Sequence, residues 1–146
     1  MIQYDPVDIL IVEDNPADSE LMLRALKKDN LANQVYLVED GAEAIDFLFC
    51  RGKYSDRSQT KPPKVIFLDL KLPKVSGIEV LKAIRSNEGT ARLPVVVVTS
   101  SREDPDIRTA YELGANAYVV KPVNFDDFIN AVRHTGFFWM LVNQSP

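Results

Sequence analysis

Side chains that could do chemistry stand directly after short apolar runs in this sequence. They are Glu13, Asp14, Asp69, Thr99 and Lys121. Carboxylates that lie close together repel one another and shift each other's pKa unless a cation lies among them. Oxygen ligands of this kind suit Mg²⁺, which keeps several waters and binds one or two carboxylates together with phosphate oxygens. An ammonium and a hydroxyl nearby would contact a phosphoryl group. The residues therefore predict Mg²⁺-assisted phosphoryl chemistry if the fold brings them together.

Whether these residues meet depends on the elements that carry them. Apolar, strand-like runs at 9–12, 35–38, 65–68, 95–98 and 118–120 alternate with helical patterns along the chain. Strands without polar alternation are typical of a parallel sheet buried on both faces, and parallel strands need crossover helices. The pattern therefore predicts an α/β fold. We expect a flavodoxin-like, doubly wound sheet of five parallel strands in the order 2-1-3-4-5, with helices on both faces.

This strand order places a topological switch point between the first and third strands. The carboxyl ends of parallel strands lie along one edge of the sheet. Glu13 and Asp14, which follow the first strand, should therefore meet Asp69, which follows the third, in one crevice. Thr99 and Lys121 should lie further along the same edge.

Local signals mark where several helices begin and end. Asp40 and Ser76 each stand three residues before a glutamate, which is the spacing of a capping box. Asn124 is expected to cap the last helix, and Gly114 to end the one before it. The stretch 51–64, RGKYSDRSQTKPPK, is polar and contains two prolines, so we predict a solvated surface loop.

Composition limits the classes of function. The chain has 146 residues, of which 46% are hydrophobic and 26% charged, as is typical of one globular domain. The net charge of −4 and the lack of a basic stripe argue against nucleic-acid binding. The single cysteine, Cys50, cannot form an internal disulfide. No signal-peptide pattern opens the chain, and the apolar run 137–142 is too short to span a bilayer. We expect a cytoplasmic protein that binds neither nucleic acid nor membrane.

Four sequence blocks resemble the response-regulator receiver domain. They are VEDN at 12–15, FLDLKLPKVSG at 67–77, LPVVVVTSS at 93–101 and GANAYVVKP at 114–122. All four occur in order at the ends of the expected strands, and the resemblance covers about residues 7–133. The chain would then be one receiver domain, 1–146, with a core at about 7–133 and an apolar C-terminal extension at 134–146.

The resemblance implies a role for each site residue. Asp69 would be the phosphoacceptor, with Mg²⁺ held by Glu13, Asp14, Asp69 and the backbone carbonyl of Lys71. Thr99 and Lys121 would contact the phosphoryl oxygens, and the Lys121-Pro122 peptide bond would be cis. Thr99 and Tyr118 would form the switch that changes the partner-binding surface. The side chain of Lys71 is expected to influence how long the phosphoryl group survives.

The same resemblance suggests partners. The phosphoryl donor would be a phosphohistidine on a sensor histidine kinase. The loop 51–64 and the tail FFWMLVNQSP are similar to those of stand-alone receivers that work with phytochrome-type kinases. An apolar tail needs a cover, so we expect a homodimer formed through the tail and the face of the fourth helix, fifth strand and fifth helix.

The sequence leaves two alternative functions open. A haloacid-dehalogenase-type phosphatase also uses a strand-end aspartate with Mg²⁺, but it needs a second aspartate two residues later, where this chain has Lys71. A receiver-like binding module could act without phosphorylation, although the complete set of site residues argues against it. In the favoured reading the chain is no conventional enzyme and catalyses only its own phosphorylation and dephosphorylation.

Overall fold

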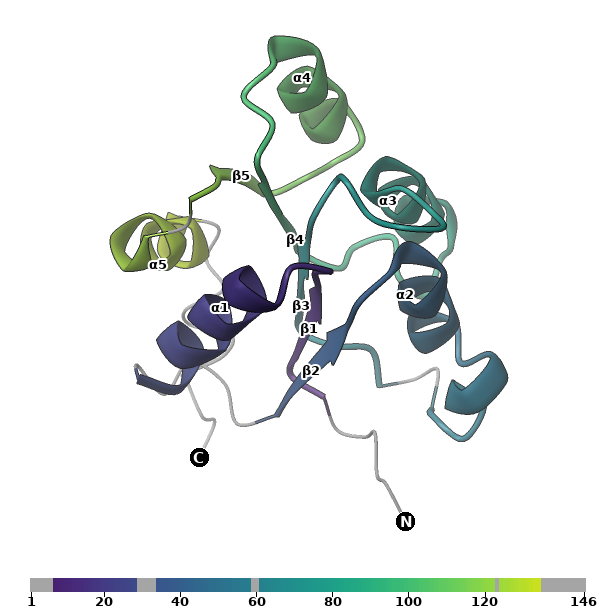
Figure 1. The fold of residues 1–146 in the computed structure, drawn as a ribbon. Coiled ribbons are helices and arrows are strands. Elements are labelled where there is room, and N and C mark those ends of the chain that lie inside the picture. The colour runs from purple at the N-terminus through teal and green to yellow at the C-terminus, as the bar shows by residue number, and fades with distance from the viewer. Residues whose placement is uncertain (1–6, 29–33, 59–60, 123, 135–146) are drawn as a thin grey trace.

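A computed structural model of the chain describes residues 7–28, 34–58, 61–122 and 124–134. Its centre is a sheet of five parallel strands in the order β2-β1-β3-β4-β5 (Figure 1). The strands are β1 (Ile9–Val12), β2 (Val35–Val38), β3 (Val65–Leu68), β4 (Val95–Thr99) and β5 (Ala117–Val120). This arrangement confirms the predicted flavodoxin-like fold and its strand order.

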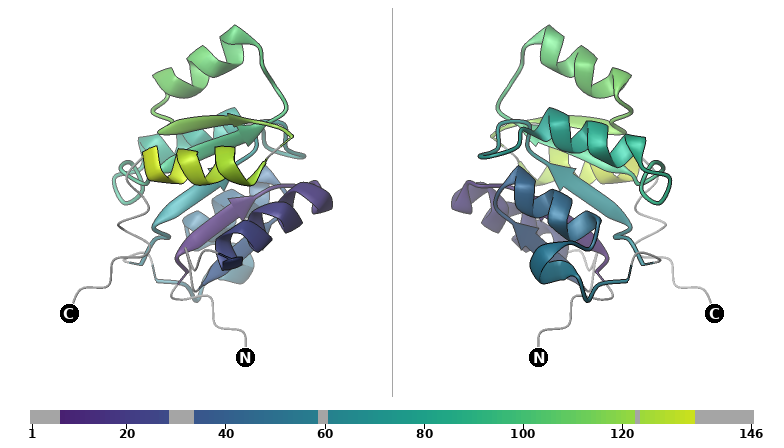
Figure 2. Two further views of the ribbon diagram at one scale, coloured as in Figure 1. Left: turned by 90° about the vertical axis from the view of Figure 1, so that its left-hand side faces the viewer. Right: turned by 90° about the vertical axis from the view of Figure 1, so that its right-hand side faces the viewer.

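Helices cover both faces of the sheet. They are α1 (Pro16–Lys28), α2 (Gly41–Leu48), α3 (Gly77–Ser86), α4 (Asp104–Glu112) and α5 (Phe125–His134). Helices α1 and α5 lie together on one face, whereas α2 and α3 lie on the other (Figures 1 and 2). Helix α4 stands beside β4 and β5, at the end of the sheet away from β2. Each helix connects two parallel strands or follows the last one, as the crossover argument requires.

Alternate residues of each strand pack into two separate hydrophobic cores, one on each face of the sheet. In β1, Ile9 and Ile11 pack with side chains of α1 and α5, whereas Leu10 and Val12 pack with side chains of α2 and α3. These four residues are at most 1% exposed, which explains why the strand has no polar alternation. The interior of β1 offers no ionisable side chain, so the acidic residues Glu13 and Asp14 stand where this strand ends.

Asp40, Ser76 and Asn124 cap their helices as predicted, each by accepting a hydrogen bond from a backbone N–H three residues later. The carboxylate of Asp40 accepts a hydrogen bond from the Glu43 N–H, and the Ser76 hydroxyl accepts one from the Glu79 N–H. Asn124 Oδ1 accepts from the N–H of Asp127 at 2.7 Å, so it caps α5. Gly114 follows α4 with a φ of +89°, a conformation that favours glycine.

The prediction of a solvated loop at 51–64 is wrong for three of its described residues, Tyr54, Arg57 and Pro63, which are buried. Tyr54, at the end of the short 3₁₀ helix Gly52–Tyr54, is fully buried, and Arg57 is 5% exposed. The Tyr54 hydroxyl donates to Glu43 Oε1 at 2.5 Å, and the Arg57 guanidinium lies over the Phe47 ring. The loop is anchored because its long polar side chains find hydrogen-bond partners and an aromatic face beneath it.

Within the described residues, no helix combines the length and the apolar character that crossing a bilayer requires. The predicted apolar C-terminal extension at 134–146 lies, except for His134 at the end of α5, outside the described residues.

Candidate functional site

Three carboxylates meet where β1 and β3 end. The two strands are neighbours, with Val12 paired to Leu68, so the residues that follow them are brought together. Carboxylate oxygens of Glu13, Asp14 and Asp69 all lie within 4.8 Å of one another. Glu13 and Asp69 are buried, whereas Asp14 is exposed, so the cluster opens to solvent on one side. This all-oxygen set fits a hard divalent cation such as Mg²⁺.

Lys121, which follows β5, places its ammonium against this cluster. Its Nζ lies 2.6 Å from Glu13 Oε1 and 3.1 Å from Asp69 Oδ2. A third carboxylate, Asp18 of α1, lies 2.9 Å from the same nitrogen. Burial alone would lower the pKa of Lys121, but the hydrogen bonds to Glu13 and Asp18 and the charge of Asp69 raise it above its usual value. Lys121 is therefore a fixed cation in the site.

Glu13 lies in the least solvated position of the cluster. Burial raises the pKa of its carboxyl from 4.5 to about 7, although the hydrogen bond from Lys121 opposes this shift, and the nearby Asp69 charge adds to it. The backbone N–H of Asn15 also donates to Glu13 Oε2, at 3.2 Å. A divalent cation would favour the ionised form of this carboxyl, because an added positive charge stabilises a carboxylate.

Asp69 is held by the backbone on both sides. Its N–H donates to the Val12 carbonyl at 3.1 Å, and the N–H of Lys71 donates to Asp69 Oδ1 at 3.2 Å. Gly77, the first residue of α3, packs against this turn, and a Cβ there would lie 2.1 Å from the Asp69 carbonyl oxygen. Only glycine fits so close an approach, so Gly77 fixes the position of the turn that carries Asp69.

Thr99 ends β4, the strand next to β3, and is fully buried. Its hydroxyl has no hydrogen-bond partner among the residues that the structure describes. A buried hydroxyl without a partner is costly, so an acceptor that reaches this position would be bound favourably. A phosphoryl oxygen at the site edge is such an acceptor.

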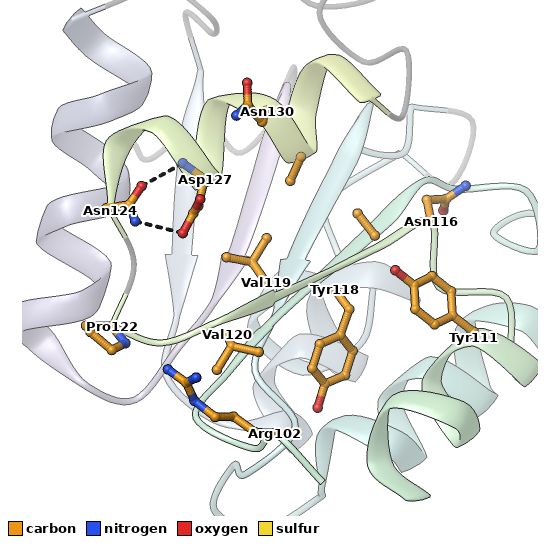
Figure 3. A pocket seen from close by; sticks show the side chains of 12 residues that line it. Arg102, Tyr111, Asn116, Tyr118, Val119, Val120, Pro122, Asn124, Asp127 and Asn130 are labelled. Atoms are coloured by element: carbon orange, nitrogen blue, oxygen red, sulfur yellow. Dashed lines mark hydrogen bonds between the residues drawn. The ribbon is translucent and has the colours of Figure 1, made fainter. Parts of the chain in front are cut away.

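Tyr118 lies in the middle of β5, facing α4. Its hydroxyl donates to the backbone carbonyl of Ser101 at 3.0 Å, and its ring centroid is 6.4 Å from that of Tyr111. Tyr118 is half-buried and forms part of a groove of about 620 Å³ that runs along β5 between α4 and α5 (Figure 3). Arg102 and Asp127 line the same groove. Tyr118 thus lines this groove and also contacts the loop between β4 and α4, through its hydrogen bond to Ser101.

The structure brings together the three carboxylates and the lysine that the sequence singled out at the strand ends. Glu13, Asp14 and Asp69 form the cluster, Lys121 contacts it, and the Lys121-Pro122 bond is cis. The roles given to these residues, and that of the Lys71 carbonyl, stay predictions.

Two residues of the site were missed by the sequence argument. The carboxylate of Asp18 follows Asp14 by four residues, but an acid in the first turn of a helix is also explained by the helix dipole. Gly77 stands inside a predicted capping box and ends the block 67–77, but its close approach to the Asp69 turn depends on tertiary structure and was not predicted.

Comparisons with known proteins agree on one family. A model of the response regulator receiver domain matches residues 9–133. The chain is 38% identical over 135 residues to the response regulator Rcp1 of Synechocystis sp., covering 92% of this chain and 90% of that protein. The bacteriophytochrome response regulator AtBRR has a solved structure that is similar to this one, with 50% identity and a TM-score of 0.80. That match covers 94% of this chain and 98% of AtBRR.

Two further solved structures bear on the chemistry of relatives. The Mn²⁺-bound form of Rcp1 matches with 36% identity and a TM-score of 0.78, over 96% of this chain and 98% of that one. The phosphorylated cyanobacterial phytochrome response regulator RcpA matches with 35% identity and a TM-score of 0.77, over 96% of each chain.

Proposed function

The chain belongs to the response regulator receiver domain family, as its four sequence blocks predicted, and we propose that it accepts a phosphoryl group onto Asp69 from a sensor histidine kinase. The observation that carries this proposal is the convergence of Asp69 with Glu13, Asp14 and Lys121 at one edge of the sheet. The relatives Rcp1 and RcpA, whose structures hold Mn²⁺ and a phosphoryl group respectively, support it.

In the proposed reaction an Asp69 carboxylate oxygen attacks the phosphorus of a phosphohistidine. A new O–P bond forms, and the N–P bond breaks with its electron pair returning to the histidine nitrogen. The bond from the Lys71 N–H to Asp69 Oδ1 orients the carboxylate. Lys121, 3.1 Å from Oδ2, offsets negative charge on the phosphoryl oxygens.

A divalent cation, Mg²⁺ in this proposal, would be held by Glu13, Asp14, Asp69 and the carbonyl of Lys71, and it would neutralise charge on the transferring group. The close carboxylate oxygens support such a site, since together they repel one another without a cation. The Lys121 ammonium already pairs with the Glu13 carboxylate, so a cation that binds there has to compete with it.

We further propose that Thr99 and Tyr118 carry the response. A phosphoryl group on Asp69 offers the acceptor that the Thr99 hydroxyl lacks among the described residues. Movement of Thr99 would pull on the β4–α4 loop, which Tyr118 contacts through the Ser101 carbonyl. The groove between α4 and α5 would then change shape.

The proposed setting is a stand-alone regulator, consisting of a single receiver domain, in the cytoplasm. Similarity to AtBRR and Rcp1 favours a phytochrome-type kinase as the phosphoryl donor. The homodimer through the tail and the α4-β5-α5 face remains part of the proposal. Membership of the receiver family removes most of the support for a haloacid-dehalogenase-type phosphatase. A phosphorylation-independent binding module is the outcome if the following experiment fails.

Incubation with acetyl phosphate and Mg²⁺, followed by intact-mass measurement, tests the proposal. The wild-type protein should gain one phosphoryl group, and Asp69→Asn should gain none. Asp126→Asn, an equal change at an exposed residue of α5, is the matched control and should be labelled normally. Full labelling in EDTA would refute the role of the metal, and unchanged labelling of Asp69→Asn would refute the phosphoacceptor.

A further inference from the structure

Lys121 has three carboxylate partners, and one differs from the other two. Its Nζ lies 2.6 Å from Glu13, 2.9 Å from Asp18 and 3.1 Å from Asp69. Glu13 and Asp69 belong to the cluster that could hold a metal ion, whereas Asp18 lies outside it. Once a cation has bound to Glu13 and Asp69, Asp18 would be the one of these three carboxylates that still forms an ion pair with Lys121.

Local structure explains why Asp18 stands where it does. Asn15 Oδ1 accepts hydrogen bonds from the N–H groups of Ala17 and Asp18, which fixes the first turn of α1. The side chains of Asp18 and Lys121 are 19% and 12% exposed, so solvent and salt screen this ion pair less than a surface pair. The contact joins α1 to the end of β5 across the mouth of the site.

We propose that Asp18 is a positioning residue that holds the Lys121 ammonium beside the site while a divalent cation takes over Glu13 and Asp69. This inference rests on the metal site proposed above. Without metal, Lys121 neutralises Glu13 and Asp69 and competes with a cation for their oxygens. Asp18 makes it easier for a cation to replace the Lys121 ammonium at Glu13 and Asp69. The displaced ammonium still pairs with the Asp18 carboxylate, whereas an unpaired charge in this poorly solvated region would be costly. The ammonium then stays within reach of a phosphoryl group on Asp69.

The change Asp18→Asn keeps the shape of the side chain and removes its charge. It should weaken the binding of Mn²⁺ roughly three- to tenfold, the range expected for the loss of one partly buried ion pair. The free-ion signal in electron paramagnetic resonance measures this binding directly. Glu20→Gln is the matched control, since it removes the same charge from the same helix but its partner, Arg24, lies on the surface. Asp18→Glu should restore most of the affinity.

The same substitution in a Lys121→Met variant shows whether Asp18 acts by positioning Lys121 or only through its own negative charge. In Lys121→Met, the further change Asp18→Asn should alter Mn²⁺ affinity no more than Glu20→Gln does, because the residue that Asp18 holds is gone. An equal loss in both backgrounds would mean that Asp18 acts on the ion itself, and would overturn the inference. Unchanged affinity of Asp18→Asn alone would overturn it too. If the wild-type protein binds no Mn²⁺, the proposed metal site fails together with the inference. Thermal unfolding of each variant checks that it is folded.

Discussion

Replacing Thr99 by valine should stabilise the resting protein while it abolishes the response to phosphorylation. The hydroxyl of Thr99 is fully buried and has no partner among the described residues, and such a group costs about 1–3 kcal/mol relative to one that is satisfied. Valine has nearly the same shape and no polar atom. We therefore expect Thr99→Val to raise the free energy of unfolding by about 1 kcal/mol, or the melting temperature by roughly 2–4 °C for a chain of this size.

Thr90 provides the matched control for this prediction. It is 5% exposed, and its hydroxyl donates to the carbonyl of Ile84 at 2.7 Å. Thr90→Val should lower the free energy of unfolding by about 1 kcal/mol, because a satisfied hydrogen bond is lost and a buried carbonyl loses a donor. The two variants carry the same chemical change, so they should differ in sign.

Urea unfolding followed by far-UV circular dichroism measures both variants, with the midpoint compared at constant slope. Intact-mass labelling with acetyl phosphate then shows whether Thr99→Val still takes up a phosphoryl group, which we expect. Partner binding that depends on phosphorylation should be lost. If Thr99→Val loses as much stability as Thr90→Val does, the Thr99 hydroxyl is satisfied in the resting protein and the reasoning is wrong.

Three other predictions concern protonation, the anchored loop and the tail. Because burial raises the pKa of Glu13 from 4.5 to about 7, the folded, metal-free protein binds a proton more tightly than the unfolded chain does. The free energy of unfolding should therefore fall as pH rises between those values, and urea titrations of Glu13→Gln should lack that slope. Tyr54→Phe removes the hydroxyl that donates to Glu43 and should cost about 1–2 kcal/mol in thermal or urea unfolding, whereas unchanged stability would contradict the buried network. In sedimentation velocity the intact chain should be a dimer and a chain ending at Thr135 a monomer; an intact monomer, with or without phosphoryl-Asp69, would refute the dimer.

The sequence predicted the parallel sheet because each strand is a short apolar run without polar alternation. The four residues of β1 are apolar without alternation, and the structure buries all of them. The order of the strands followed from βα alternation and from the few topologies open to five parallel strands. The cluster of Glu13, Asp14 and Asp69 followed in turn, because residues after neighbouring parallel strands have to lie at one edge.

Contacts in which a side chain reaches across elements could not be predicted from the sequence. Nothing in the letters around Tyr54 distinguishes a solvated tyrosine from one whose hydroxyl finds Glu43, eleven residues earlier. Likewise, the length and angle of the Lys121 side chain decide that it reaches Asp18, and neither can be read from spacing. Polar residues in loops carry little periodic information, so their burial emerges only when the helices are packed.

The strand order also determines when the site can exist. Its parts come from residues 13 to 121, at the ends of β1, β3, β4 and β5, so the first and the last part are separated by most of the described chain. A chain emerging from the ribosome presents Asp69 long before Lys121, and until β5 is added the carboxylates lack their internal ammonium. Contacts so distant in sequence carry a large loop-closure entropy, which slows the folding of a chain that depends on them. If Asp69 accepts a phosphoryl group as proposed, a fragment that ends before β5 lacks Lys121 and should not be phosphorylated at the rate of the full chain.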